Sequence, residues 1–213
     1  MNVRRIVILG NSGAARECYW LLQDVLQAQS DLRFKGFLSF EGFKGNLCEL
    51  SDLEMGSDDN YPAEQEDLFV IGIGNPVVRG KAFLKWKGRG CQFMNLVHPT
   101  VRFVGSHSIG EANILAHGCH ISCNTTIGSA NYLNGSVVLG HDVRIGDNNF
   151  LAPFTQLLGG ARVGSGNSFG VNTVALAGAK IGSNNTIAPG AYIYKGCGDN
   201  QFLAGNPAQR VDA

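Results

Sequence analysis

The chain has 213 residues, in which 17 Lys and Arg side chains balance 17 Asp and Glu side chains. A net charge of zero argues against a protein that binds nucleic acid, because neutralising phosphates requires an excess of basic side chains. No apolar run approaches the roughly 18 residues of a membrane-spanning helix, and the run at 6–9 is too short for a signal peptide. We therefore expect a cytoplasmic protein that does not enter a membrane.

The composition changes near Val97. Residues 1–96 contain 23 charged side chains, whereas residues 97–213 contain 11, together with 18 of the 29 glycines. Because two such different compositions indicate two structural regimes, we expect two domains, at 1–96 and 97–213.

The first part is typical of a small α/β domain. The β-branched run at 6–9 predicts a buried strand, and the apolar spacing from Cys18 to Val25 predicts a helix after the turn at 10–13. Strands alternating with helices predict a short parallel sheet. The remaining predicted elements are strands at 34–40, 68–74 and 93–97, a helix at 76–87 and a loop at 41–66.

A six-residue repeat organises the second part. Stepping by six from Val97 to Ile193 gives 17 positions, all apolar and without an insertion. One inward side chain and one turn in every six residues predict a parallel β-helix, in which three sides form a coil of 18 residues. The positions are Val97, Phe103, Ile109, Leu115, Ile121, Ile127, Leu133, Leu139, Ile145, Leu151, Leu157, Val163, Phe169, Ala175, Ile181, Ile187 and Ile193.

A second pattern has the period of a whole coil. Stacked at the spacing of neighbouring strands, about 4.8 Å, asparagine side chains can hydrogen-bond along a column. We therefore predict a structural ladder to which we assign no chemistry. Its members are Asn113, Asn131, Asn149, Asn167 and Asn185.

At these repeats the chain resembles the hexapeptide-repeat acyltransferases. Within them it is most similar to the bacterial sugar acyltransferases, which include sialic acid O-acetyltransferases and N-acetyltransferases of nucleotide-linked amino-sugars. The resemblance covers nearly the whole chain, including Val-His-Pro-Thr at 97–100, Gly-His-Asp at 140–142 and Gly-Asn-Pro-Ala at 205–208. It implies a Rossmann-like N-terminal domain followed by a left-handed β-helix.

The resemblance also implies an activity and an assembly. Such proteins form homotrimers, bind acetyl-CoA in a groove between neighbouring β-helices, and receive the sugar from the side of the N-terminal domain. We therefore expect an acetyl-CoA-dependent acetyltransferase without a metal, acting on a sugar, foremost a nucleotide-linked amino-sugar. A sialic acid-type sugar O-acetyltransferase is the alternative.

Acyl transfer to an amine or hydroxyl needs a base for the proton of the attacking group. Among five histidines, His141 is the strongest candidate, because it follows the inward Leu139 by two residues and should face outward at a corner. The adjacent Asp142 would orient the imidazole and stabilise its protonated form. The resemblance at 140–142 implies the same two catalytic residues.

Two further residues take a role from the resemblance. Gly159 lies 18 residues beyond His141, so its backbone should stack beside the histidine. The family implies that the Gly159 amide donates to the acetyl carbonyl. Asn134 matches a polar family position that helps to place the substrate.

A basic column also recurs at the coil period, at Arg144, Arg162 and Lys180. Like charges so close together repel each other unless counter-ions lie beside them. Since CoA carries a 3′-phosphate and a pyrophosphate, we expect Arg162 and Lys180 to bind its phosphates. A solvated edge, or pairing with acidic side chains across a trimer interface, is the alternative.

The first strand and helix are joined by the turn Gly10-Asn11-Ser12-Gly13, whose amides could hold a phosphate at the helix N-terminus. It lacks the full dinucleotide fingerprint, so we expect no dinucleotide cofactor. The resemblance implies that this turn contacts the nucleotide-sugar; the alternative is a tight turn without a ligand. The family commonly has histidines at the positions of Ala14 and Phe150, and Phe150 would make the acceptor groove more apolar.

Two other classes of function are compatible with a β-helix. A metal-dependent hydratase needs three histidines around zinc, and His117, His120 and His141 are present at an unsuitable spacing. A non-catalytic scaffold that binds a nucleotide-sugar needs no base. Metal analysis tests the first class, and turnover of acetyl-CoA tests the second.

Overall fold

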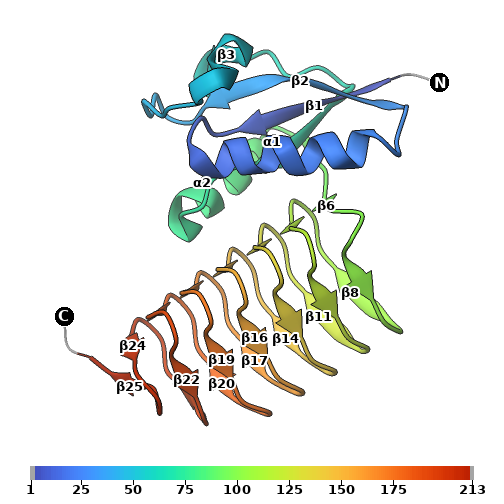
Figure 1. The fold of residues 1–213 in the computed structure, drawn as a ribbon. Coiled ribbons are helices and arrows are strands. Elements are labelled where there is room, and N and C mark those ends of the chain that lie inside the picture. Colours follow the sequence, from blue (N-terminus) through green and yellow to red (C-terminus); the bar gives the residue numbers. More distant parts are fainter. Residues whose placement is uncertain (1–2, 212–213) are drawn as a thin grey trace.

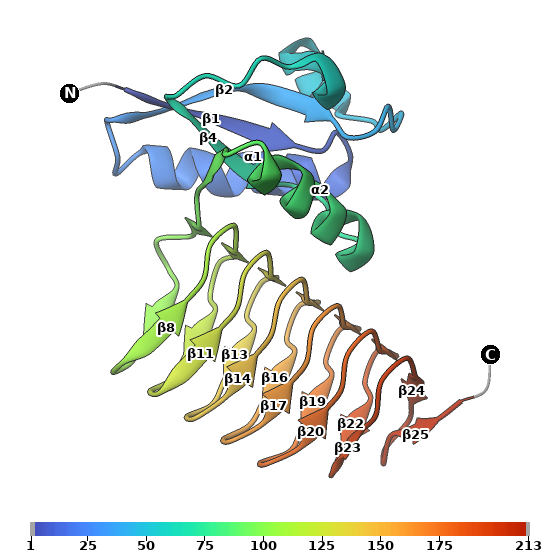
Figure 2. The same ribbon diagram turned by 180° about the vertical axis from the view of Figure 1, so that it is seen from behind.

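The computed structural model describes residues 3–211, which form two stacked units (Figure 1). The N-terminal unit lies over a column of coils formed by the rest of the chain. Seen from behind, helix α2 descends from the N-terminal unit toward this column (Figure 2). Neither helix within residues 3–211 combines the length and the apolar character that crossing a membrane requires.

The N-terminal unit contains five parallel strands in the spatial order β3-β2-β1-β4-β5. The central strand β1 carries the predicted run at 6–9, which is fully buried. The strands are β1 (Arg4–Leu9), β2 (Leu32–Ser39), β3 (Glu54–Ser57), β4 (Asp67–Ile71) and β5 (Gln92–Phe93).

Two helices accompany this sheet, both close to their predicted positions. Helix α1 (Gly13–Leu26) buries Cys18, Leu22 and Val25, the predicted apolar face. Helix α2 (Pro76–Gly88) begins where the side chain of Asn75 accepts hydrogen bonds from two N–H groups of the first turn. This cap satisfies backbone donors that a helix start otherwise leaves unpaired.

Two sequence predictions differ from the structure. The predicted loop at 41–66 contains β3 and two 3₁₀ helices, Cys48–Leu53 and Asp58–Asn60. The four residues of β3 are mostly exposed, so they show no apolar pattern, and pairing with β2 makes them a strand. The predicted strand 93–97 is divided between β5 and the first strand of the β-helix.

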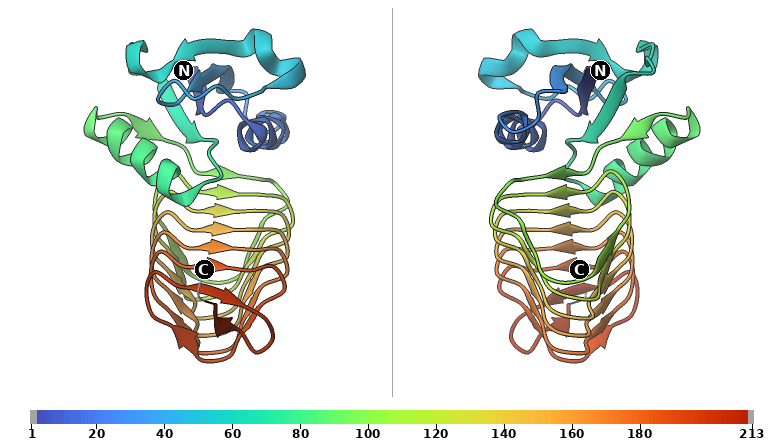
Figure 3. Two further views of the ribbon diagram at one scale, coloured as in Figure 1. Left: turned by 90° about the vertical axis from the view of Figure 1, so that its left-hand side faces the viewer. Right: turned by 90° about the vertical axis from the view of Figure 1, so that its right-hand side faces the viewer.

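Three sheets enclose the β-helix, which Figure 3 shows roughly end-on. The domain-facing sheet contains β6 (Leu96–Val97), β9 (Ile114–Leu115), β12 (Tyr132–Leu133), β15 (Phe150–Leu151), β18 (Ser168–Phe169), β21 (Thr186–Ile187), β24 (Phe202–Ala204) and the antiparallel β25 (Gln209–Arg210). The β13 sheet contains β7 (Arg102–Phe103), β10 (His120–Ile121), β13 (Val138–Leu139), β16 (Gln156–Leu157), β19 (Val174–Ala175) and β22 (Tyr192–Ile193). The β14 sheet contains β8 (His107–Ile109), β11 (Thr125–Ile127), β14 (Arg144–Ile145), β17 (Arg162–Val163), β20 (Lys180–Ile181) and β23 (Gly196–Cys197).

The six-residue repeat fills the interior of the β-helix. All 17 predicted positions belong to one hydrophobic cluster, in which Val97, Phe103 and Ile109 are half-buried and the others buried. Neighbouring coils pair in register, so that Leu139 lies beside Leu157 on the next coil. The predicted parallel β-helix with an 18-residue coil is therefore confirmed.

The asparagine ladder is confirmed as well. All five side chains are buried, and the Oδ1 of Asn131 accepts hydrogen bonds from the backbone and side-chain nitrogens of Asn149, at 2.9 and 3.0 Å. At the corners, every sixth residue from Ala112 to Gly190 has a positive φ, which turns the chain from one sheet to the next.

The domain-facing sheet packs against the N-terminal unit. Ile114 and Tyr132 join the hydrophobic cluster that contains Ile6 and Leu22. The hydroxyl of Tyr132 donates to the carboxylate of Glu17 on α1 at 2.8 Å. Consequently the β13 sheet, the β14 sheet and the corner between them face away from the N-terminal unit of the same chain.

Candidate active site

His141 and Asp142 form the corner between β13 and β14, opposite the domain-facing sheet. Their side chains are 66% and 56% exposed, as predicted for an outward corner. The Nδ1 of His141 lies 2.7 Å from the Oδ2 of Asp142. A neutral imidazole that donates from Nδ1 to this carboxylate leaves the lone pair of Nε2 free to accept a proton.

Backbone and neighbours hold Asp142 in this position. Its φ of 60° places it in the left-handed conformation of the corner, which Asp tolerates better than most residues. Asn124, one coil earlier, donates to the Oδ1 of Asp142 at 3.3 Å. The hydrogen bond from His141 and, secondarily, that from Asn124 lower the pKa of Asp142, so its carboxylate is ionised at neutral pH.

Gly159 lies against the imidazole from the next coil. A Cβ at Gly159 would stand 2.5 Å from the Nε2 of His141, so only glycine lets the ring occupy this place. The N–H of Gly159 donates to no acceptor within residues 3–211. A base, its carboxylate and an unused backbone donor therefore meet on one exposed corner, the set of groups that direct acyl transfer requires.

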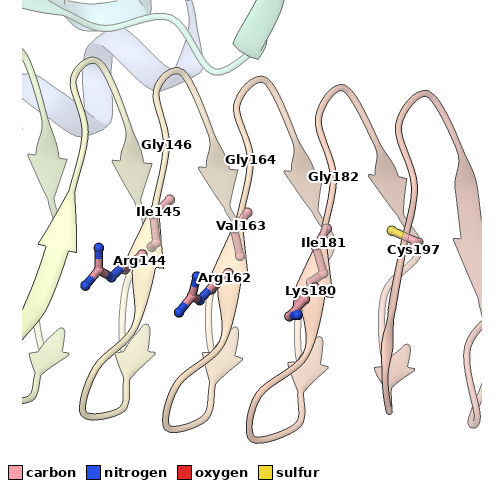
Figure 4. A pocket seen from close by; sticks show the side chains of 10 residues that line it. All are labelled: Arg144, Ile145, Gly146, Arg162, Val163, Gly164, Lys180, Ile181, Gly182 and Cys197. Atoms are coloured by element: carbon pink, nitrogen blue, oxygen red, sulfur yellow. The ribbon is translucent and has the colours of Figure 1, made fainter.

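The basic column runs along the outer face of the β14 sheet. Arg144, Arg162 and Lys180 occupy paired positions on successive strands and project in one row (Figure 4). They line an open trough of about 620 Å³, and no carboxylate within residues 3–211 lies within ion-pair distance of any of the three. A second hollow of about 450 Å³ shares Arg144 and Arg162 with this trough and is also lined by Asp142, the neighbour of His141.

The turn of the N-terminal unit lines a separate pocket of about 350 Å³, beyond the carboxyl ends of β1 and β4. Ligands of open parallel sheets bind in this place. Gly10, Asn11 and Ser12 line the pocket, and Gly13 begins α1 behind them. The φ of Gly10 is 121°, and a Cβ there would lie 2.5 Å from the carbonyl oxygen of Gly72, so this crossing requires glycine.

Asn11 is a buried polar side chain at the wall of this pocket. Its Nδ2 donates to the carbonyl of Phe43 and the carboxylate of Glu54, both at 3.0 Å. Its Oδ1 is buried and has no hydrogen-bond partner among the described residues. Through its Nδ2, the amide of Asn11 therefore ties the turn to the loop at Phe43 and to β3.

Asn134 lies apart from His141 in this chain. It lines a cleft of about 440 Å³ with His117 at the corner after the domain-facing sheet, and with Glu17 and Trp20 of α1. The structure thus brings His141, Asp142 and Gly159 together, whereas Asn134 and the turn at 10–13 lie elsewhere.

Ala14 and Phe150, the two positions at which the resembling family commonly has histidine, both pack against a hydrophobic cluster. Ala14 packs in the N-terminal core. Phe150 meets Tyr132 edge to face, with ring centroids 5.4 Å apart, in the contact between the two units. Within one chain, Phe150 therefore does not border the corner of His141.

The candidate zinc ligands His117, His120 and His141 do not converge within residues 3–211. In residues 3–211, no three His, Cys, Asp or Glu side chains are placed to hold a metal ion together. His117 and His141 lie at different corners of the β-helix, and His120 lies on the strand between them.

Sequence reasoning missed Asn124 and the far wall of the N-terminal pocket. The signal for Asn124 was present, because it stands 18 residues before Asp142, at the coil period. Phe43 and Asn75 also line the pocket. Both lie in loops that are distant from the turn at 10–13 in the sequence and share no repeat with it. Only the folded sheet brings them to the same pocket.

Comparisons with known proteins place this fold. No protein-family model and no curated protein matches the chain. A perosamine N-acetyltransferase variant from Caulobacter crescentus, solved with CoA and GDP-perosamine, is similar with a TM-score of 0.88 and 24% identity, over 99% of this chain and 98% of that one. The acetyltransferase domain of PglB from Neisseria gonorrhoeae, in complex with acetyl coenzyme A, is similar with a TM-score of 0.87 and 18% identity, over 99% of this chain and 100% of that one. WeeI from Acinetobacter baumannii is similar with a TM-score of 0.76 and 22% identity, over 98% of this chain and 100% of that one. The chain therefore has the fold of these solved proteins over nearly its whole length.

Proposed function

We propose that the protein is an acetyl-CoA-dependent acetyltransferase that acts on a nucleotide-linked amino-sugar, with His141 as general base. The observation that carries the proposal is the His141–Asp142 pair beside the free N–H of Gly159. The fold shared with an enzyme solved with CoA and GDP-perosamine supports it. The proposal includes a Rossmann-like domain at 1–96 and a left-handed β-helix at 97–213, supported by the strand order and the regular short strands.

In the proposed reaction, the Nε2 of His141 takes the proton of the acceptor amine as that amine attacks the thioester carbonyl. The oxygen that gains charge accepts a hydrogen bond from the N–H of Gly159. Asp142 stabilises the imidazolium, which then gives its proton to the departing CoA thiolate. The acetyl group passes directly to the acceptor, without a covalent enzyme intermediate.

Acetyl transfer to a panel of nucleotide-linked amino-sugars tests this function, with release of the CoA thiol as the measurement. Sialic acid in the same panel tests the alternative of sugar O-acetylation. Binding of a nucleotide-sugar without release of CoA would favour the non-catalytic scaffold and contradict the proposal.

The placement of the site within one chain supports a homotrimer. The pocket at Gly10 lies in the N-terminal unit, whereas His141 lies at the corner opposite the sheet on which that unit sits. A neighbouring copy is therefore needed to bring a base to a bound acceptor. Exposed Phe154, Tyr192 and Tyr194, on and beside the β13 sheet, provide an apolar surface for such a copy.

We expect the purified protein to sediment as a trimer at micromolar concentration, because each site needs groups from two chains and the resemblance implies three copies. Sedimentation velocity measures this directly. A protein that sediments as a monomer under these conditions while transferring acetyl groups would contradict the shared site.

We also propose that Arg162 and Lys180 bind the phosphates of acetyl-CoA. Changing either to alanine should raise the KM for acetyl-CoA about tenfold, the value of a charge-assisted hydrogen bond. The effect should shrink with acetyl-pantetheine, which lacks these phosphates.

Arg102→Ala is the matched control, because Arg102 is an exposed arginine on the β13 sheet and outside the trough. Its KM for acetyl-CoA should stay unchanged. Equal effects of Arg162→Ala on both donors would show that the column acts through structure and not through phosphate.

A further inference from the structure

Arg79 is a buried cation at the contact between the two units. It lies on α2, has no exposed surface and meets no carboxylate within hydrogen-bond distance among the described residues. Burial lowers the pKa of Arg79 to about 10, so the guanidinium is still protonated at neutral pH. Burying a charge costs free energy unless its N–H groups donate hydrogen bonds, so the partners of the guanidinium indicate its role.

Four backbone carbonyls from three segments surround the guanidinium. Its Nε donates to the carbonyl of Ala130 at 2.8 Å and its Nη2 to that of Asn149 at 2.7 Å, on successive coils of the β-helix. Its Nη1 donates to the carbonyls of Ile73 and Gly74, at 2.9 and 2.8 Å, in the loop after β4. A planar group with fixed donor directions thereby holds these segments in one arrangement.

The same loop forms a wall of the N-terminal pocket. Ile73 and Gly74 line it together with Gly10 and Asn11. Arg79 therefore connects the pocket wall directly to two coils of the β-helix.

The helix that carries Arg79 also lies close to the β-helix. A Cβ at Gly80 would stand 3.2 Å from the side chain of Asn148, at the corner beside Asn149. A Cβ there would require Asn148 to shift by a few tenths of an ångström, so the close approach of α2 and the guanidinium of Arg79 act at the same contact.

We propose that Arg79 is a positioning residue, which holds the acceptor pocket of the N-terminal unit at a fixed place on the β-helix. The inference rests on the proposed function for its kinetic consequence. A pocket that shifts on the β-helix presents the acceptor at the wrong distance from the base, while the trough at Arg162 and Lys180 is unaffected.

The test compares Arg79→Met, which removes every donor, with Arg79→Lys, which keeps the charge but not the planar fork. We expect Arg79→Met to lower kcat/KM for the acceptor roughly 10- to 100-fold, since misplacement by about 1 Å can cost 100-fold. Arg79→Lys should lose an intermediate amount. The KM for acetyl-CoA should change less than twofold in both variants.

Lys87→Met is the matched control. Lys87 is also a cation of α2 that contacts the β-helix, through an exposed ion pair with Glu111. Exposed pairs contribute little, so this variant should keep the acceptor kinetics of the wild type. A loss equal to that of Arg79→Met would overturn the specific role of Arg79.

Hydrogen exchange gives a readout that does not depend on activity. In Arg79→Met, amides of residues 72–80 should exchange faster, while those of the distal coils at 160–195 keep wild-type rates. Uniformly faster exchange would show a general loss of stability, and unchanged exchange at 72–80 would show no positioning; either overturns the inference. If the wild type transfers no acetyl group, the proposed function fails, while the exchange result still decides whether Arg79 fixes the pocket wall.

Discussion

Replacing His141 with alanine is expected to lower kcat by roughly 10²- to 10⁴-fold, the usual contribution of a positioned general base. Binding of acetyl-CoA should change little, because in the proposed reaction the Nε2 acts on the acceptor and the CoA phosphates lie along the β14 sheet. Steady-state rates with saturating acetyl-CoA, together with calorimetric binding of CoA, measure both quantities.

His107→Ala is the control for this variant. His107 is exposed and stacks on Phe103 at the first coil, two coils before the coil of His141. It should retain wild-type kcat. If His141→Ala instead keeps near wild-type kcat with the true acceptor at neutral pH, the base lies elsewhere.

Asp142→Asn should lose less activity than His141→Ala, because Asp142 orients and stabilises the imidazole without touching the acceptor. Since the pKa of Asp142 is lowered in the folded protein, its carboxylate is charged at neutral pH and is lost only as the pH falls through that lowered value. The difference between wild type and Asp142→Asn should therefore persist across neutral pH.

The β-helix was predictable from the sequence because each coil repeats the same local pattern of residues. One inward side chain, one turn and one paired strand recur every six residues, so one misleading position does not change the register that the others indicate. The corner of His141 followed from the same register, since counting two residues from Leu139 places its side chain outward. Gly159 and Asn124 lie one coil on either side at the same period.

The N-terminal unit and its contact with the β-helix were less predictable. The strand β3 has no pattern of its own, and its place depends on β2. Arg79 looked like an ordinary charged residue of a helix, because nothing in its neighbourhood in the sequence reveals that Ala130 and Asn149 lie beside it. Asn134 lies at a different corner from His141, because the seven residues between them carry the chain past a whole sheet.

Replacing Leu139 with aspartate is expected to unfold the β-helix. Leu139 is fully buried and stacks between Ile121 and Leu157 on neighbouring coils. A carboxyl group there would have no hydrogen-bond partner from the inward side chains, at a cost of about 4 kcal/mol or more, comparable to the whole stability of many domains. Thermal unfolding and sedimentation of the variant measure the loss.

Ser108→Asp separates the effect of burial from that of the aspartate itself. Ser108 is exposed on β8, directly before Ile109, which is one of the inward positions. An added carboxylate at this outward position stays hydrated, so the free energy of unfolding should change by less than about 0.5 kcal/mol. A Leu139→Asp protein that is folded and trimeric would mean that the inward register is wrong by at least one residue. Since one residue exchanges inward and outward side chains along a strand, such an error would also turn His141 away from the surface on which the proposed reaction depends.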